Sequence, residues 1–168
     1  MDYPNGDRYI GELRNSKKSS LRAKYLHHTG AVFEGGFKED ERNGRGQMRY
    51  VNGDVYTGNW VDGYRSGKGW YQYSTREEYE GDWEADIRSG NGVMKFDNGD
   101  SYNGQWYEGQ KSGYGIYQYH GGEIYEGCWK EDVRCGKGRF LFPTGDKLTG
   151  KFENDQIGKF FIWLKLDS

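Results

Sequence analysis

A repeat of 23 residues constrains this chain more than any other feature of its sequence. Each copy starts with an aromatic residue, has glycine two positions on and tryptophan four on, and continues with Gly-x-Gly at positions eleven and thirteen; the exceptions to the frame are Phe37 for tryptophan and Arg76 for a later glycine. A second aromatic follows at seventeen and another glycine at twenty. The copies start at Phe33, Tyr56, Tyr79, Tyr102 and Tyr125, and Leu148 continues the series. Equal steps of this kind predict an array of similar units, each too small to fold alone.

The period inside each copy is two, which predicts strands. Tyr56, Gly58 and Trp60 alternate with polar residues, as expected for one face of a strand. The density of glycine excludes helices. We therefore expect an all-β chain, an elongated single-layer antiparallel meander of repeated hairpins with about fourteen strands.

The turns follow from keeping the aromatic residues on one face. A three-residue loop over Val51–Gly53, with glycine in the left-handed conformation, places Tyr50 and Tyr56 on the same side. The other connection needs an even number of residues, and we expect four, Asp62–Arg65.

The repeated glycines are expected to make room for rings. A ring lies flat on a neighbouring backbone only where no Cβ intervenes. The structural glycines predicted on this basis are Gly58, Gly67, Gly69, Gly81, Gly90, Gly92, Gly104, Gly113, Gly115, Gly127, Gly136 and Gly138.

The repeats predict a single array over residues 1–168. Residues 1–32 form a degenerate first repeat, 33–147 contain five well-formed repeats, and 148–168 form a shortened capping repeat. An open meander has an unpaired strand at each end. The apolar tail Phe160–Leu164 is expected either to fold over its own edge or to pair with a second copy in a homodimer.

Composition narrows the class of protein. The mean hydropathy of -1.11 is typical of disorder, but 17% aromatic residues and glycines at fixed positions predict a folded chain. A net charge of -2 gives no sign of nucleic-acid binding. The N-terminus has no signal region, so we expect a cytoplasmic protein in which Cys128 and Cys135 are reduced thiols.

The frame Tyr-x-Gly-x-Trp, at Tyr56–Trp60 and Tyr125–Trp129, followed by Gly-x-Gly, resembles the MORN (membrane occupation and recognition nexus) repeat over nearly the whole chain. The resemblance implies an elongated, twisted sheet of hairpins. It also implies a role as a protein scaffold in cytoskeletal and ciliary or flagellar assemblies, as a membrane tether, or as an array beside an enzyme domain. Small chains built only of these repeats resemble the axonemal and flagellar members most.

The aromatic face is the candidate binding site. We expect it to hold an extended peptide or an amphipathic helix of a protein partner, and the alternative is that its rings only complete the sheet. The predicted contact residues are Trp60, Tyr71, Tyr73, Trp83, Phe96, Trp106, Tyr117, Tyr119, Trp129, Phe140 and Phe142. Trp70 is the clear ring on the opposite face.

Charged residues recur at two places in the repeat. One position carries a basic residue in every copy: Arg42, Arg65, Arg88, Lys111 and Arg134. We expect these residues at the loop edge in solvated ion pairs. The alternative is that they contact anionic lipid or an acidic partner. The opposite turns carry acidic residues that are expected to cap turns and discourage edge association: Asp7, Asp54, Glu77, Asp100, Glu123 and Asp146.

The sequence gives no support for catalysis. The neighbouring His27 and His28 are expected to point to opposite faces of a strand, so no metal site is predicted, and no cofactor is expected. We therefore expect a non-catalytic interaction scaffold. The alternatives are a peripheral membrane module that binds anionic phospholipid, and a targeting segment of a larger enzyme.

Overall fold

The computed structural model describes residues 1–165, without the side chains of residues 159 and 160. Residues 166–168, the end of the predicted capping repeat, lie outside the described residues. Residues 1–165 contain strands but no helix, and so no helix long and apolar enough to cross a membrane. Contacts divide the chain into two compact units, Met1–Ile87 and Arg88 onward.

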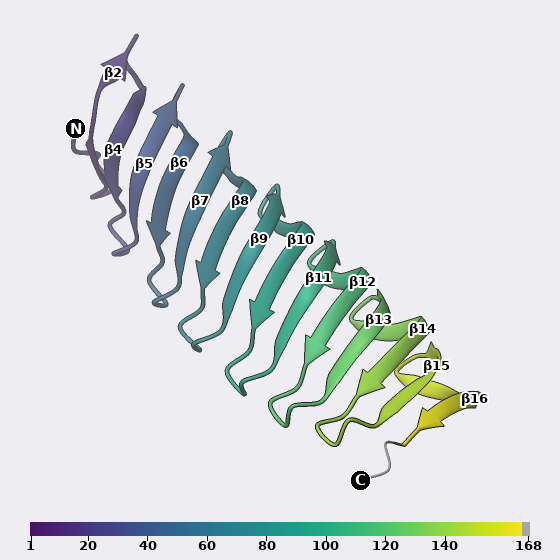
Figure 1. Cartoon of the computed structure of the whole chain (residues 1–168). Coiled ribbons are helices and arrows are strands. Elements are labelled where there is room, and N and C mark those ends of the chain that lie inside the picture. The colour runs from purple at the N-terminus through teal and green to yellow at the C-terminus, as the bar shows by residue number, and fades with distance from the viewer. Residues whose placement is uncertain (166–168) are drawn as a thin grey trace. The chain divides into compact units, whose positions relative to one another are not determined.

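In the first unit the strands follow one another as an antiparallel meander (Figure 1) in the order β1-β4-β5-β6-β7-β8-β9, and β2 and β3 form a separate small hairpin in the degenerate first repeat. Their bounds are β1 Arg8–Ile10, β2 Leu13–Arg14, β3 Lys17–Lys18, β4 Ser20–Leu26, β5 Val32–Lys38, β6 Glu41–Arg49, β7 Val55–Val61, β8 Tyr64–Gln72 and β9 Glu78–Glu84.

The second unit continues the same pattern from β10 to β16, each strand antiparallel to the next. Its strands are β10 Ile87–Lys95, β11 Ser101–Tyr107, β12 Gln110–Gln118, β13 Ile124–Lys130, β14 Val133–Leu141, β15 Lys147–Glu153 and β16 Gln156–Leu164. The predicted all-β antiparallel meander of hairpins is confirmed.

The three-residue loop is also confirmed. The Tyr50 N–H donates to the carbonyl oxygen of Asp54 at 2.9 Å, which leaves three residues in the loop. The last of them, Gly53, has a φ of +92°, the left-handed conformation that favours glycine. Phe96 and Asp100 close the corresponding loop of the second unit with the same bond, also at 2.9 Å.

The four-residue connection is wrong, because the turn has two residues. Val61 pairs directly with Tyr64, so only Asp62 and Gly63 form the turn, with φ of +48° and +85°. Two successive positive φ values are typical of a type I′ turn, whose twist matches that of the strands. This turn brings Arg65 opposite Trp60, and the register shifts beyond that pair, between Gly58 and Trp60.

The glycines serve two purposes. A Cβ on Gly69 would lie 2.5 Å from Cε2 and 2.6 Å from Cζ of Tyr56, so the glycine is the slot for that ring, as predicted. The same holds for Gly115 beneath Tyr102. The first glycine of each Gly-x-Gly pair has a different reason, since Gly67 adopts a φ of +67° at the register shift. The corresponding glycines share this conformation: Gly90, Gly113 and Gly136.

The core of each unit is a layer of rings. Tyr56 has no exposed surface and packs edge-to-face against Trp60 at 5.2 Å and Trp83 at 5.5 Å between ring centroids. Its hydroxyl donates to the carbonyl of Asn59 at 3.0 Å. Tyr102 repeats the arrangement with Trp106 and Trp129. Each such ring pair contributes about 0.5–1.5 kcal/mol beyond the burial of its area, so the rings replace an aliphatic core.

The last strand leaves apolar surface accessible. In β16 the side chain of Ile162 is 63% exposed and that of Trp163 is 49% exposed, although β16 is paired with β15. Capping of the chain's own edge and pairing with a second copy both stay predictions.

Candidate functional site

Burial divides the eleven aromatic residues predicted to bind a partner into two groups. The tryptophans and Tyr71 are almost inaccessible, with exposed fractions of 1, 5, 4 and 3% for Trp60, Trp83, Trp106 and Trp129 and 8% for Tyr71. The others are half-buried and keep accessible ring surface: Tyr73, Phe96, Tyr117, Tyr119, Phe140 and Phe142. Partner binding by these residues stays a prediction, but the surface that could serve it is narrower than the whole face.

In the second unit the half-buried rings and the exposed ring of Trp163 form a continuous series, which we call the ring row (Phe96, Tyr117, Tyr119, Phe140, Phe142 and Trp163). Successive ring centroids lie 5.8, 4.6, 6.1, 6.0 and 5.3 Å apart. The row arises because aromatic residues at positions fifteen and seventeen of each copy lie on one face of a strand, next to the three-residue loop. Residue Trp163, which sequence reasoning missed as a member, extends it to the last strand.

The tryptophans are buried by the repeated basic residues. The guanidinium carbon of Arg65 lies 4.4 Å from the ring centroid of Trp83, and that of Arg88 lies 4.4 Å from Trp106. In the copy where the cation is Lys111, its ammonium lies 4.5 Å from the ring of Trp129. These distances fit cation–π contacts.

The position of the basic residues corrects the expectation of solvated ion pairs at the loop edge. The Arg65 side chain is only 17% exposed, donates from Nε to Asp86 Oδ1 at 2.8 Å, and donates from a terminal nitrogen to the Asp86 carbonyl at 2.9 Å. Burial lowers the pKa of Arg42 and of Lys111. The two-residue turn is the reason, because it returns the basic residue to the strand beside a tryptophan. Contacts of these residues with lipid or an acidic partner stay a prediction.

The acidic residues of the opposite turns have a structural role in part of the array. Asp54 is 7% exposed and accepts hydrogen bonds from the Tyr71 hydroxyl at 2.7 Å and the Ser74 N–H at 2.8 Å. Asp100 does the same for Tyr117 and the backbone of His120. These two carboxylates therefore cap turns as expected, although the turn that each caps is the next one of its kind along the chain.

A shallow hollow lies along the ring row of the second unit. It is lined by Tyr119, Phe140, Phe142 and Leu148, with the carboxylate of Glu123 and the guanidinium of Arg134 at its polar side. Arg134 donates to the Tyr119 hydroxyl at 3.3 Å and to Asp155 Oδ1 at 2.8 Å. The hollow can therefore take an apolar side chain and offer it hydrogen-bonding groups.

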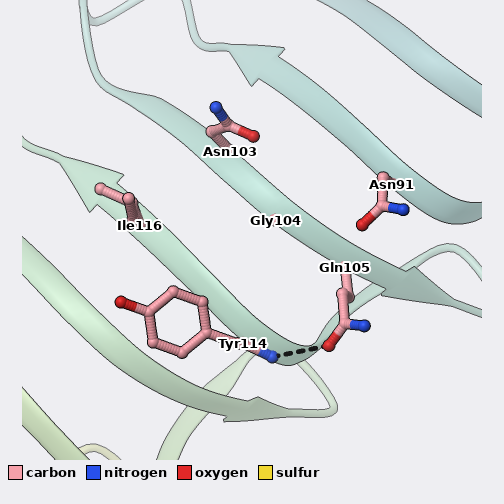
Figure 2. A pocket seen from close by; sticks show the side chains of 6 residues that line it. All are labelled: Asn91, Asn103, Gly104, Gln105, Tyr114 and Ile116. Atoms are coloured by element: carbon pink, nitrogen blue, oxygen red, sulfur yellow. Dashed lines mark hydrogen bonds between the residues drawn. The ribbon is translucent and has the colours of Figure 1, made fainter.

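The opposite face of the second unit is more polar (Figure 2). There the side chains of Asn91 from β10 and of Asn103 and Gln105 from β11 lie beside Tyr114 and Ile116 from β12. Gln105 Oε1 accepts a hydrogen bond from the Tyr114 N–H at 2.8 Å, which satisfies the backbone at the register shift (Figure 2). Trp70, predicted on this face in the first unit, pairs with Thr57 and is half-buried.

The histidines and cysteines are placed differently from expectation. His28 Nδ1 lies 2.9 Å from Asp7 Oδ1 and His27 Nδ1 lies 3.9 Å from Asp7 Oδ2, because β4 ends at Leu26 and the strand alternation ends with it. Among residues 1–165 we find no cluster of three or more metal-ligating side chains. The two cysteines lie face to face, a proximity that sequence reasoning missed.

Comparisons with known proteins agree with this geometry. The sequence matches the MORN repeat at residues 33–55, 56–76, 79–101, 102–124 and 125–147. No curated protein matches it. Among solved structures, the SAS-4 (dCPAP) TCP domain of Drosophila melanogaster, in complex with a proline-rich motif of Ana2 (dSTIL), is similar with a TM-score of 0.55 and 14% identity, covering 90% of this chain and 82% of that one.

The TCP10c domain of Drosophila melanogaster Sas-4 is similar with a TM-score of 0.50 and 14% identity, over 86% of this chain and 85% of that one. At this identity the likeness is one of fold. The five matched repeats, which cover more than half of the chain, identify it as a member of the MORN repeat family.

Proposed function

We propose that this chain is a non-catalytic scaffold that binds an extended segment of a partner protein along the ring row. The observation that carries the proposal is the spacing of the rings. Alternate residues of an extended or polyproline II segment are about 6–7 Å apart. Neighbouring rings of the row lie between 4.6 and 6.1 Å apart, at or somewhat below this spacing, so alternate side chains of an extended peptide can each contact a ring.

The chemistry of the row favours a segment that contains proline. Flat aromatic surfaces bind polyproline II segments, which lose little conformational entropy because they are already extended. Tyr119 and Phe140 are stacked with an interplanar angle of 27°, and Phe140 and Phe142 with 23°, so the row offers nearly parallel ring edges. A domain of similar fold has been solved in complex with a proline-rich motif, which supports a proline-containing segment as the partner.

We place this scaffold in a cytoskeletal assembly, and more narrowly in a cilium or flagellum, on the basis of its family. An array of such repeats is expected to act by holding partners at a fixed spacing. The tagged chain should remain in the detergent-resistant cytoskeletal fraction. A variant with Tyr119→Ala and Phe142→Ala should be released from it.

Site-specific photo-cross-linking in native extract tests the proposal. A photoreactive phenylalanine analogue replaces Phe142 in the row and, as the matched control, Tyr114, which is 59% exposed on the opposite face. The expected result is a cross-linked protein at position 142 that is absent at 114, with the cross-link mapped by mass spectrometry to an extended segment. Equal cross-linking at both positions, or cross-linking at 114 alone, contradicts the proposal.

Binding to anionic phospholipid is the competing outcome. Because the basic residues lie over tryptophan rings, we expect no salt-sensitive sedimentation with phosphoinositide vesicles. Sedimentation that decreases with salt and is lost when Arg65, Arg88 and Arg134 become Ala would favour the membrane function instead. Binding of the wild-type chain is measured first, since these substitutions also remove packing.

A further inference from the structure

Cys128 and Cys135 form a matched pair across two neighbouring strands. Cys128 in β13 lies directly opposite Cys135 in β14, and their sulfur atoms are 2.6 Å apart. Both are free thiols and both are half-buried, so small solutes can reach them. The two-residue turn between Lys130 and Val133 sets this pairing, and the register shifts only beyond it, between Gly127 and Cys128.

The sequence of the other repeats shows that the pair is particular to this copy. At the same two positions the neighbouring copies carry polar residues, Asn59 with Ser66 and Asp82 with Ser89. In the preceding copy they are Gln105 and Ser112, which also lie opposite each other. In this one repeat, therefore, both members of a cross-strand pair are cysteine. Two unrelated surface cysteines would not be expected to lie directly opposite each other.

We propose that Cys128 and Cys135 are a reversible dithiol–disulfide site, oxidised by a low-molecular-weight disulfide such as glutathione disulfide. Side chains directly opposite each other on antiparallel strands have Cβ atoms about 4.5–5.5 Å apart, close to the separation that a disulfide requires. The pair closes with little movement of the backbone, because the two sulfur atoms already face each other.

The exchange proceeds in two steps. The Cys128 thiolate attacks one sulfur of glutathione disulfide, a mixed disulfide forms, and the first glutathione leaves as a thiolate. Cys135 then loses its proton to solvent and attacks the Cys128 sulfur, and the second glutathione leaves. Two protein thiols are oxidised to one disulfide, and one glutathione disulfide is reduced to two glutathione molecules that take up the two protons.

The environment of the pair assigns the order of the steps. Burial, together with the hydrogen bond to Cys128, raises the pKa of Cys135 to about 11. The raised pKa leaves Cys135 with the smaller thiolate fraction, so we assign Cys135 the second step and Cys128 the first attack. The reaction should become faster as the pH rises, since the thiolate is the attacking species.

Peptide mapping of the full chain tests the proposal. The native protein is incubated with excess glutathione disulfide, alkylated and digested with trypsin, which cleaves after Lys130 and Arg134 between the two cysteines. The expected product is a disulfide-linked pair of peptides, with loss of both free thiols and full reversal by reduced glutathione. The oxidised chain should also unfold at a higher urea concentration than the reduced chain.

Two variants separate geometry from general reactivity. Gln105→Cys with Ser112→Cys, in a chain that carries Cys128→Ser and Cys135→Ser, restores the same pairing one repeat earlier and should form the link as well. Cys128→Ser with Ser112→Cys leaves Cys135 without an opposite thiol, and each cysteine should take up one glutathione. A wild-type chain that carries glutathione on both cysteines without a link, or forms mainly intermolecular disulfides, overturns the proposal.

Discussion

Substitution of Gly69 by alanine tests the claim that the absence of a Cβ is what allows the rings to pack. The new Cβ would lie 2.5 Å from Cε2 and 2.6 Å from Cζ of Tyr56, about 1 Å closer than ordinary contact between carbon atoms. Tyr56 is fully buried between Trp60 and Trp83, so its ring has no free space into which it can move.

The expected loss of stability follows from two effects. Overpacking of this kind costs about 1–3 kcal/mol. A displaced Tyr56 also gives up the hydrogen bond from its hydroxyl to the Asn59 carbonyl, now at 3.0 Å, which contributes roughly 1 kcal/mol. We therefore expect Gly69→Ala to lower the free energy of unfolding by about 3 kcal/mol.

Urea denaturation followed by tryptophan fluorescence measures this loss, because Trp60 and Trp83 both contact the ring. The decisive comparison is a double-mutant cycle with Tyr56→Leu, which removes the ring that the Cβ would meet. In that background Gly69→Ala should cost under about 1 kcal/mol, a coupling of roughly 2 kcal/mol. Gly53→Ala is the control: it is strained by its φ of +92°, and its nearest contact is Ser74.

The reasoning is refuted if Gly69→Ala costs the same with and without the Tyr56 ring. It is equally refuted if the single variant is as stable as the wild type. A cost for Gly53→Ala that depends on Tyr56 would show that the cycle reports a general loss of structure and not the slot.

Two further predictions concern the charged residues. Lys111 lies over Trp129 in the same way as Arg88 lies over Trp106, so a lysine can fill this position. Measured in urea, Arg88→Lys should therefore lower the free energy of unfolding by less than about 1 kcal/mol, and Arg88→Ala by about 2 kcal/mol. Equal losses for the two variants would exclude a cation–π role. For Asp54, burial acts to raise the pKa, but hydrogen bonds from Tyr71 and the backbone of Ser74 outweigh it and the pKa is lowered. The folded pKa then lies below the unfolded value, so this stabilisation is complete above about pH 4 and is lost as the pH falls through the folded pKa. Asp54→Asn should therefore be less stable at neutral pH and lose less stability on acidification, and a thermal-unfolding series that shows a steeper acid loss in the variant would contradict this.

The alternation of residues was enough to predict the strands and one of the two turns. Tyr50 and Tyr56 reach the same face only across an odd loop, and the observed loop of three residues agrees. At the other connection, keeping Trp60 and Gly67 on one face requires only an even number of loop residues. Both two and four residues meet this condition, so the alternation could not decide between them. The Asp62-Gly63 dipeptide, typical of a type I′ turn, was the signal that could have decided between them.

That difference of two residues changed the interpretation of the site. With a four-residue loop, Arg65 belongs to a solvent-exposed edge. With a two-residue turn it lies opposite Trp60 and over Trp83. The cation covers an indole that would otherwise remain open to a partner, which is why the accessible surface is the ring row and not the tryptophans.

The sequence alone determined the repeat, the strand periodicity, the aromatic face and the family, because each depends on spacing along the chain. The tertiary structure decided which rings are accessible, where the basic residues lie, and that Cys128 faces Cys135. The physical reason is that these three features depend on the register between neighbouring strands. A difference of two residues in a turn, or a register shift of two residues, changes which residues lie opposite each other but leaves the alternation along each strand unchanged.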